Sequence, residues 1–327
     1  MVGWLRCSFL QALLVQASGL RLDIQMPCVR GGATMMAAAA EEVNLDERYA
    51  AIADSQTLQQ VAYEAWVAAN VDGPALTAKA AALGLTLDIP NGQVAYAPDF
   101  EERRLKLCFD FVYCRHGKTT GNTEPRVYQG YVDEPSNALN EIGLAQAQEA
   151  ADKLDALSLD PDLVVLSPLS RAAETGLAYT RRHPELSERT EYWEDAAEMR
   201  FGAWDNVMVK DLANDNICHL FYLTQNAVVK PDAPYVRPSD GTAFEAENFV
   251  EMAERMLGVL TKLNERMQPL ATGGKRPLAI MYGHSMAGAA LSILTGNGKV
   301  VNGETYLGFD GKYIMPNATP VYLHKIE

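Results

Sequence analysis

Cysteine is scarce in this chain, and its spacing excludes two kinds of cross-linked fold. The five cysteines stand at positions 7, 28, 108, 114 and 218 and form no Cys-x-x-Cys pair. Structural zinc sites and disulfide frameworks need paired or evenly matched cysteines. We therefore expect neither, and the sequence offers no convincing set of metal ligands or motif for an organic cofactor.

Basic residues are also in short supply. Lys and Arg number 28 against 42 Asp and Glu, which gives a formal net charge of -14. Nucleic acids and anionic membranes attract basic surfaces, so neither is expected as the main partner. An anionic small molecule would need a local cluster of positive charge.

No apolar run in the sequence is long enough to cross a bilayer comfortably. The nearest is Phe9–Leu20, which lies between Arg6 and Arg21. A short apolar stretch with basic flanks is typical of a targeting peptide, so residues 1–40 are predicted to be a transit peptide for a plastid or mitochondrion, or a secretory signal. The alternatives are a disordered tail and a cytoplasmic protein. We expect no stable membrane insertion, and the oligomeric state is open.

The remaining chain divides into two regions. Residues 41–106 have Ala-rich runs of high helix propensity and predict a helical N-terminal extension without a chemical motif. From residue 107 to 327, strand-like and helix-like segments alternate. This alternation predicts an α/β fold, a three-layer α/β/α sandwich with a mostly parallel central sheet.

Each of three strand-like runs is followed, within five residues, by Arg or His. Leu107–Tyr113 leads into Arg115 and His116, Leu163–Leu166 is followed by Arg171, and Leu278–Tyr282 leads into His284. Ligands of open α/β sheets bind outside the carboxyl ends of the strands. Two Arg and two His would meet there, where Arg can hold a phosphate dianion and a neutral imidazole can act as nucleophile.

These motifs resemble those of the histidine phosphatase superfamily, also called phosphoglycerate mutase-like, over roughly residues 107–327. The match consists of motifs in the right order: Arg115-His116-Gly117 with Thr119 and Asn122, Gly130 and Asp133, Leu139–Gly143, Ser167–Ala172 with Thr175, Glu198–Trp204, a weaker Glu247-Asn248-Phe249, and Gly283-His284-Ser285. Two departures concern the loops. Three extra residues stand between Pro135 and Leu139, and Asn206 replaces a Gly that often closes the loop after Glu198.

The resemblance implies a phosphomonoesterase that works through a phosphohistidine on a small phosphorylated metabolite. His116 would carry the phosphoryl group, and Arg115, Arg171 and His284 would hold its oxygens, His284 best as imidazolium. Asn122, Thr119 and Ser285 would bind substrate. Glu198 would give a proton to the leaving alcohol and then activate water, with Glu194 and Asp195 as competing acids.

Alternative functions remain open at this point. A phosphoglycerate-type mutase would use the same phosphohistidine, but Asp205–Lys210 does not match the run found in glycolytic mutases. A catalytically inactive binding module of the same fold is a second alternative. A Ser hydrolase using Ser285 is a third, since Gly283–Ala287 resembles a nucleophile elbow and Asp310 and His324 follow. Too little chain follows Ser285 for that fold.

Two other phosphate-handling motifs are excluded. A Cys phosphatase needs Cys-x5-Arg, and Thr120 stands where Cys114 would require Arg. A P-loop ending at Gly117-Lys118-Thr119 would need Gly at the position of Val112.

Overall fold

The computed structural model describes residues 60–123, 126–208, 211, 217, 226–297, 299–301, 304–306 and 315–326. The predicted targeting segment, the first part of the helical extension and Asp310 lie outside the described residues.

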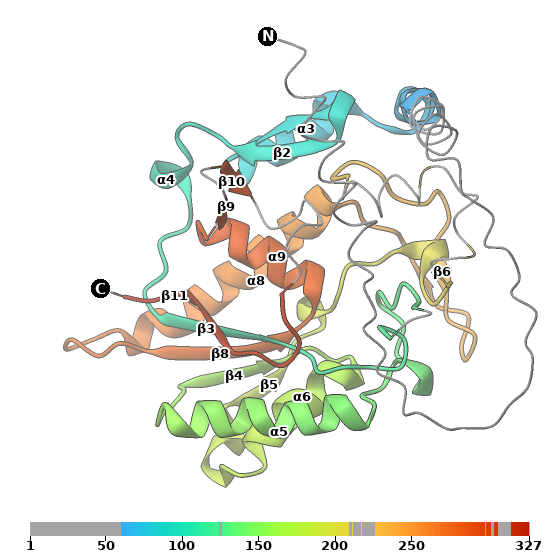
Figure 1. Ribbon diagram of the computed structural model, residues 1–327. Helices are drawn as coiled ribbons and strands as arrows, with labels where there is room; N and C mark the ends of the chain where they lie inside the picture. Colours follow the sequence, from blue (N-terminus) through green and yellow to red (C-terminus); the bar gives the residue numbers. More distant parts are fainter. Residues whose placement is uncertain are drawn as a thin grey trace, which may run out of the picture. The chain divides into compact units, whose positions relative to one another are not determined.

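A five-stranded sheet forms the centre of the fold (Figure 1), in the order β11-β3-β8-β4-β5. Its strands are β3 (Asp110–Arg115), β4 (Leu163–Leu166), β5 (Thr190–Tyr192), β8 (Leu278–Gly283) and β11 (Val321–His324). β3, β8, β4 and β5 run parallel, and only the edge strand β11 is antiparallel to its neighbour. The carboxyl ends of β3, β8 and β4 therefore meet at one edge of the sheet.

Helices cover both faces of the sheet. On one face lie α5 (Glu141–Ala156) and α6 (Ser170–Thr180), and on the other lie α8 (Phe249–Met267) and α9 (Ser285–Leu294) (Figure 1). Alternate strand residues enter two separate cores: Val112 and Ile280 pack with α5 and α6, whereas Phe111 packs with α8 and α9. The predicted three-layer α/β/α sandwich is confirmed.

The helix starts follow local sequence. Asn140 caps α5, and Asn248 with Glu251 forms a capping box at the start of α8. Ser170 does not cap α6. Its N-cap is Leu169, and the Asp133 carboxylate accepts hydrogen bonds from Ser170 N (2.9 Å) and Oγ (2.6 Å). A distant carboxylate thus replaces the local cap.

The N-terminal extension is only partly helical. A helix over 60–70 and α3 (Gly73–Ala82) agree with the prediction, but an antiparallel hairpin of β1 (Leu85–Asp88) and β2 (Gln93–Tyr96) follows, and then the short α4 (Phe100–Arg103). The described residues belong to one compact unit. The domain boundary at 106/107 stays a prediction.

Short elements complete the described chain. The strands are β6 (Tyr235–Val236), β7 (Ala243–Phe244), β9 (Lys299–Val301) and β10 (Glu304–Tyr306), and the 3-10 helices are Ile89–Asn91, Pro135–Asn137, Pro184–Arg189, Glu194–Ala196, Gly202–Trp204 and Gln268–Leu270. The insertion after Pro135 is thus a single 3-10 turn. Asn206 adopts φ 61°, the left-handed conformation that lets it replace Gly. Within the part of the chain described, no helix combines the length and apolarity that a membrane span requires.

Candidate active site

The sheet brings the predicted Arg and His residues to one edge. Arg115 ends β3 and His116 follows it, His284 follows β8, and Arg171 stands at the start of α6 after β4. The rings of His116 and His284 lie with centroids 5.4 Å apart. Glu198 enters the same group from the loop after the 3-10 helix Glu194–Ala196, and its charge acts on both Arg115 and Arg171.

His116 is a buried imidazole with a defined orientation. Its Nδ1 lies 2.7 Å from the Gly117 carbonyl oxygen, which can only accept, so Nδ1 carries the proton and Nε2 keeps its lone pair. Burial, followed by the charges of Arg171 and Arg115, holds the pKa of His116 well below its ordinary value. The ring is therefore neutral, and its free Nε2 lone pair is the form that nucleophilic attack requires.

The two arginines are oriented by backbone carbonyls. Arg171 is 1% exposed and donates from Nη1 to Val132 O (2.9 Å) and from Nη2 to Gly130 O (2.6 Å). Arg115 donates to Met315 O (2.7 Å). Both Nε atoms are buried and have no hydrogen-bond partner among the described residues. Burial lowers the pKa of Arg171 to about 10, so both guanidinium groups stay charged near neutral pH and can bind an anion.

His284 is completely buried, with Nε2 2.7 Å from Ser167 Oγ and with no partner for Nδ1 in the described chain. Burial, then Arg171, His116 and Arg115, keep its pKa well below the ordinary value. Without a bound anion His284 is therefore neutral, and the imidazolium form expected with bound phosphate stays a prediction. When the Ser167 hydroxyl donates a hydrogen bond to Nε2, Nδ1 carries the ring proton and can donate it to a ligand. A bound dianion would favour protonation of the His284 ring.

Thr119 and Asn122 form a reciprocal pair in the loop after His116. Thr119 N donates to Asn122 Oδ1 (3.0 Å), and Asn122 N donates to Thr119 Oγ1 (3.0 Å). The Thr119 hydroxyl also donates to Gln129 (2.9 Å). This leaves the buried Nδ2 of Asn122 as a donor without a partner in the described residues. The Thr119 hydroxyl thus makes its hydrogen bonds to Asn122 and Gln129.

Glu198 is set apart from its neighbouring acids by burial. It is 6% exposed, whereas Glu194 and Asp195 are exposed on the surface. Its Oε1 accepts from Met199 N (2.9 Å) and Ala287 N (3.0 Å), and its Oε2 accepts from Met286 N (3.1 Å). The first turn of α9 thus holds the carboxyl group where its N–H groups have no intrahelical acceptor.

The Ser hydrolase alternative fails on register. Ser285 begins α9 at the carboxyl end of β8, but His324 pairs with Phe111, four residues before Arg115 on β3. Four strand residues span roughly 13 Å. His324 therefore lies toward the opposite end of the sheet and cannot act as the base for Ser285.

Two contacts in the site were not predicted from the sequence. Ser167 orients His284, and its place directly after a strand-like run was a usable signal. Asn317 donates from Nδ2 to the His116 carbonyl oxygen (2.8 Å). Asn317 lies 201 residues from His116 in the sequence, so no local signal indicated this contact.

The described residues contain no group of three or more His, Cys, Asp or Glu side chains arranged to hold a metal ion. The donors gathered at the site are cationic or neutral and suit an anion.

Comparisons with known proteins agree with this geometry. The model of the histidine phosphatase superfamily (branch 1) matches residues 111–291. A mannitol-1-phosphatase of Eimeria tenella is 43% identical over 258 residues, covering 74% of this chain and 82% of the relative. The solved structure of mycobacterial hydrolase 1 superposes with a TM-score of 0.50 at 24% identity, covering 65% of this chain and 89% of that one, and supports the fold.

The chain belongs to the histidine phosphatase superfamily. Within it, the chain is a phosphomonoesterase that acts on a small phosphorylated metabolite. This identification favours hydrolysis over the mutase and inactive-module alternatives.

Proposed function

We propose that the chain hydrolyses the phosphate ester of an acyclic sugar alcohol, with mannitol 1-phosphate as the first candidate, through a phosphohistidine on His116. The choice of substrate is based on the 43% identity to a mannitol-1-phosphatase across 82% of that relative. The buried Arg115, Arg171 and His284 group supports binding of the phosphate.

In the first step, Nε2 of His116 attacks phosphorus while the bond from phosphorus to the ester oxygen breaks. Nδ1–H keeps its hydrogen bond to the Gly117 carbonyl oxygen. This bond fixes the ring and stabilises the positive charge that develops on the imidazole. Arg115, Arg171, Asn122 and His284 donate to the three equatorial oxygens, where charge spreads in the transition state. Glu198 gives its proton to the leaving alcohol.

In the second step, Glu198 takes a proton from water as the water oxygen attacks the phosphohistidine. The bond from phosphorus to Nε2 breaks, inorganic phosphate is released, and His116 returns to its neutral form. Thr119 acts in this scheme by holding Asn122, and Ser285, the first residue of α9, stays a proposed substrate contact. No metal takes part.

The test is hydrolysis of mannitol 1-phosphate by the purified chain with EDTA present, together with trapping of phosphoenzyme. We expect turnover, and an acid-labile phosphohistidine that disappears in His116→Ala, because no other group replaces the nucleophile. Ser285→Ala should keep most activity. A dead Ser285→Ala enzyme with an active His116→Ala enzyme would transfer the chemistry to serine. Turnover of other small phosphomonoesters with none of mannitol 1-phosphate would refute the substrate alone.

A further inference from the structure

A buried ion pair lies behind the loop that carries Glu198. Arg255, on α8, and Glu247, just before α8, form a bidentate pair: Nε donates to Oε1 (2.8 Å) and Nη2 donates to Oε2 (2.7 Å). Both side chains are 11% exposed. Such a pair is weak evidence of a contribution to stability, since an apolar pair of similar volume is often no worse.

The remaining N–H groups of Arg255 all reach the backbone of the Glu198 loop. Nη1 donates to Asp195 O (2.8 Å) and Ala197 O (2.9 Å), and Nη2 donates to the carbonyl oxygen of Glu198 itself (3.1 Å). Every guanidinium N–H therefore has an acceptor. Glu247 holds the loop on the other side of Glu198, because its Oε2 accepts from Arg200 N (3.1 Å).

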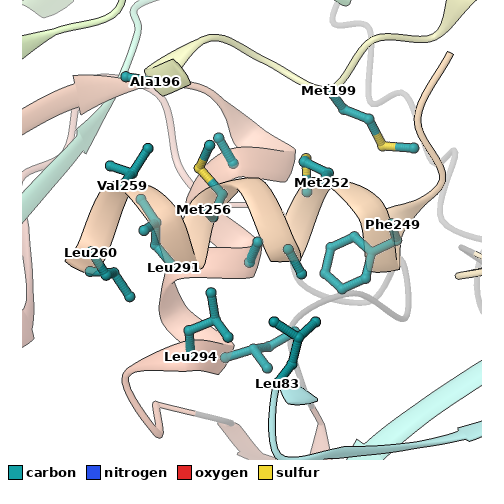
Figure 2. Packing of buried hydrophobic residues seen from close by; sticks show 14 of the residues in the cluster. Leu83, Ala196, Met199, Phe249, Met252, Met256, Val259, Leu260, Leu291 and Leu294 are labelled. Carbon is teal, nitrogen blue, oxygen red and sulfur yellow. The ribbon is translucent and has the colours of Figure 1, made fainter. Parts of the chain in front are cut away.

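The apolar side of the same loop packs on the same helix. Figure 2 shows Ala196 and Met199 next to the buried residues of α8, including Met252 and Met256. The loop backbone is thus fixed by packing and by Arg255, and the Glu198 carboxyl is held at its far end by α9. A general acid must lie within hydrogen-bond reach of the leaving oxygen, so a small shift of this loop matters.

We propose that Arg255, held by Glu247, is a positioning residue that places the Glu198 carboxyl for proton transfer to the leaving group. The inference rests on the proposed function, in which Glu198 is the acid. Lysine cannot replace Arg255 in this role. Its ammonium is a point charge with three donors and lacks the planar fork that serves three carbonyls and a carboxylate together.

The test compares Arg255→Lys with Glu198→Gln on mannitol 1-phosphate and on p-nitrophenyl phosphate. The measured quantity is kcat/KM. It reports the steps up to and including phosphoenzyme formation, so it excludes the later attack of water. An alkoxide needs the proton far more than nitrophenolate does. Glu198→Gln should lose about 10²-fold or more on the alkyl ester relative to the aryl ester, and Arg255→Lys about 10- to 100-fold in the same direction.

Three controls separate positioning from general damage. The inhibition constant of inorganic phosphate should be unchanged in Arg255→Lys, because the arginines that bind phosphate are untouched. The double variant with Glu198→Gln should be no more selective than Glu198→Gln alone. Arg266→Lys makes the same substitution on the same helix, at a surface pair with Glu191, and should leave both rates unchanged.

Each result decides the matter. Equal losses on both esters in Arg255→Lys, with a selective Glu198→Gln, would overturn the inference while the proposed function stands. An unselective Glu198→Gln would overturn the acid assignment and the inference with it. If Arg255→Lys does not fold, the isosteric Glu247→Gln serves in its place. It weakens the same clamp and should show the same selective loss, and an unselective loss there would also overturn the inference.

Discussion

The surroundings of the histidines shift their pKa values in opposite directions. Burial and nearby arginines hold the pKa of His116 and His284 well below the ordinary value, whereas hydrogen bonding to Asp155, and then to Glu185, raises the pKa of His183. NMR of the imidazole nitrogens in the free enzyme should show His183 titrating above pH 6.5. His116 and His284 should still be neutral at pH 6.5 and should gain a proton only at lower pH.

The variants His116→Ala and His183→Ala assign the signals. A His116 signal that titrates near 6.5 would contradict the prediction, because the imidazole would then be charged, and poor as a nucleophile, in mildly acidic solution.

At the scale of single residues, the residues of the site could be predicted from the sequence, but the groups that orient them could not. Arg115, His116, Arg171 and His284 could be predicted because each stands at a strand end or the helix start after it. Their partners could not. The carbonyls of Val132, Gly130 and Met315 that orient the arginines carry no side-chain signature, since any residue type supplies a carbonyl. Asn317 reaches His116 from 201 residues away in the sequence.

At the scale of elements, α5 starts unusually close to the loop after His116. Asn140 N donates to Lys118 O (3.0 Å), and a Cβ on Gly143 would overlap that same carbonyl oxygen. Alanine is ordinarily favoured over glycine inside a helix by about 1 kcal/mol. Here the overlap with backbone atoms outweighs that preference, because the Lys118 carbonyl cannot move without moving the loop that holds His116.

Gly143→Ala should therefore destabilise the protein by about 1–3 kcal/mol and lower kcat/KM. Gly258→Ala is the matched control: Gly258 lies on the exposed side of α8 with no atom near its missing Cβ. It should stabilise by about 0.5–1 kcal/mol and leave activity unchanged. Urea unfolding and steady-state kinetics of the two variants check both signs. A harmless Gly143→Ala would show that the close approach is not required.

The long elements were predictable, and the short ones were not. The apolar spacing along α8 and the unbroken apolar runs of β4 and β8 determine both element type and burial. The hairpin β1–β2 was missed because its four-residue strands follow Ala-rich helical sequence and are too short for periodicity to identify. Its turn depends on Gly92, with φ 63°, where any Cβ would overlap the buried Asn226. That contact lies far outside any local pattern.

At the scale of the whole molecule, the histidines should make opposite contributions to the pH dependence of the free energy of unfolding. The pKa values of His116 and His284 are lowered by folding, so below about pH 6.5 the unfolded chain binds protons that the folded chain does not. The free energy of unfolding should therefore fall as pH drops below 6.5. His183 acts in the other direction. Its pKa is raised in the folded protein, so its contribution is complete below the unfolded value and is lost as pH rises through the folded value.

His183 follows α6 and lies 2.6 Å from Asp155 on α5, so its charge ties two helices of one layer together. His183→Ala should destabilise the protein more at pH 5.5 than at pH 8.5. The difference should stay below about 1 kcal/mol, since solvent screens a partly exposed pair. Urea unfolding of wild type and variant at both pH values measures it. The wild type should itself be less stable at pH 5.5, because two buried neutral histidines outweigh one charged surface histidine. A variant effect that is larger at pH 8.5 would mean that His183 pairs with Asp155 as a neutral donor and that its charge contributes nothing to the folded state.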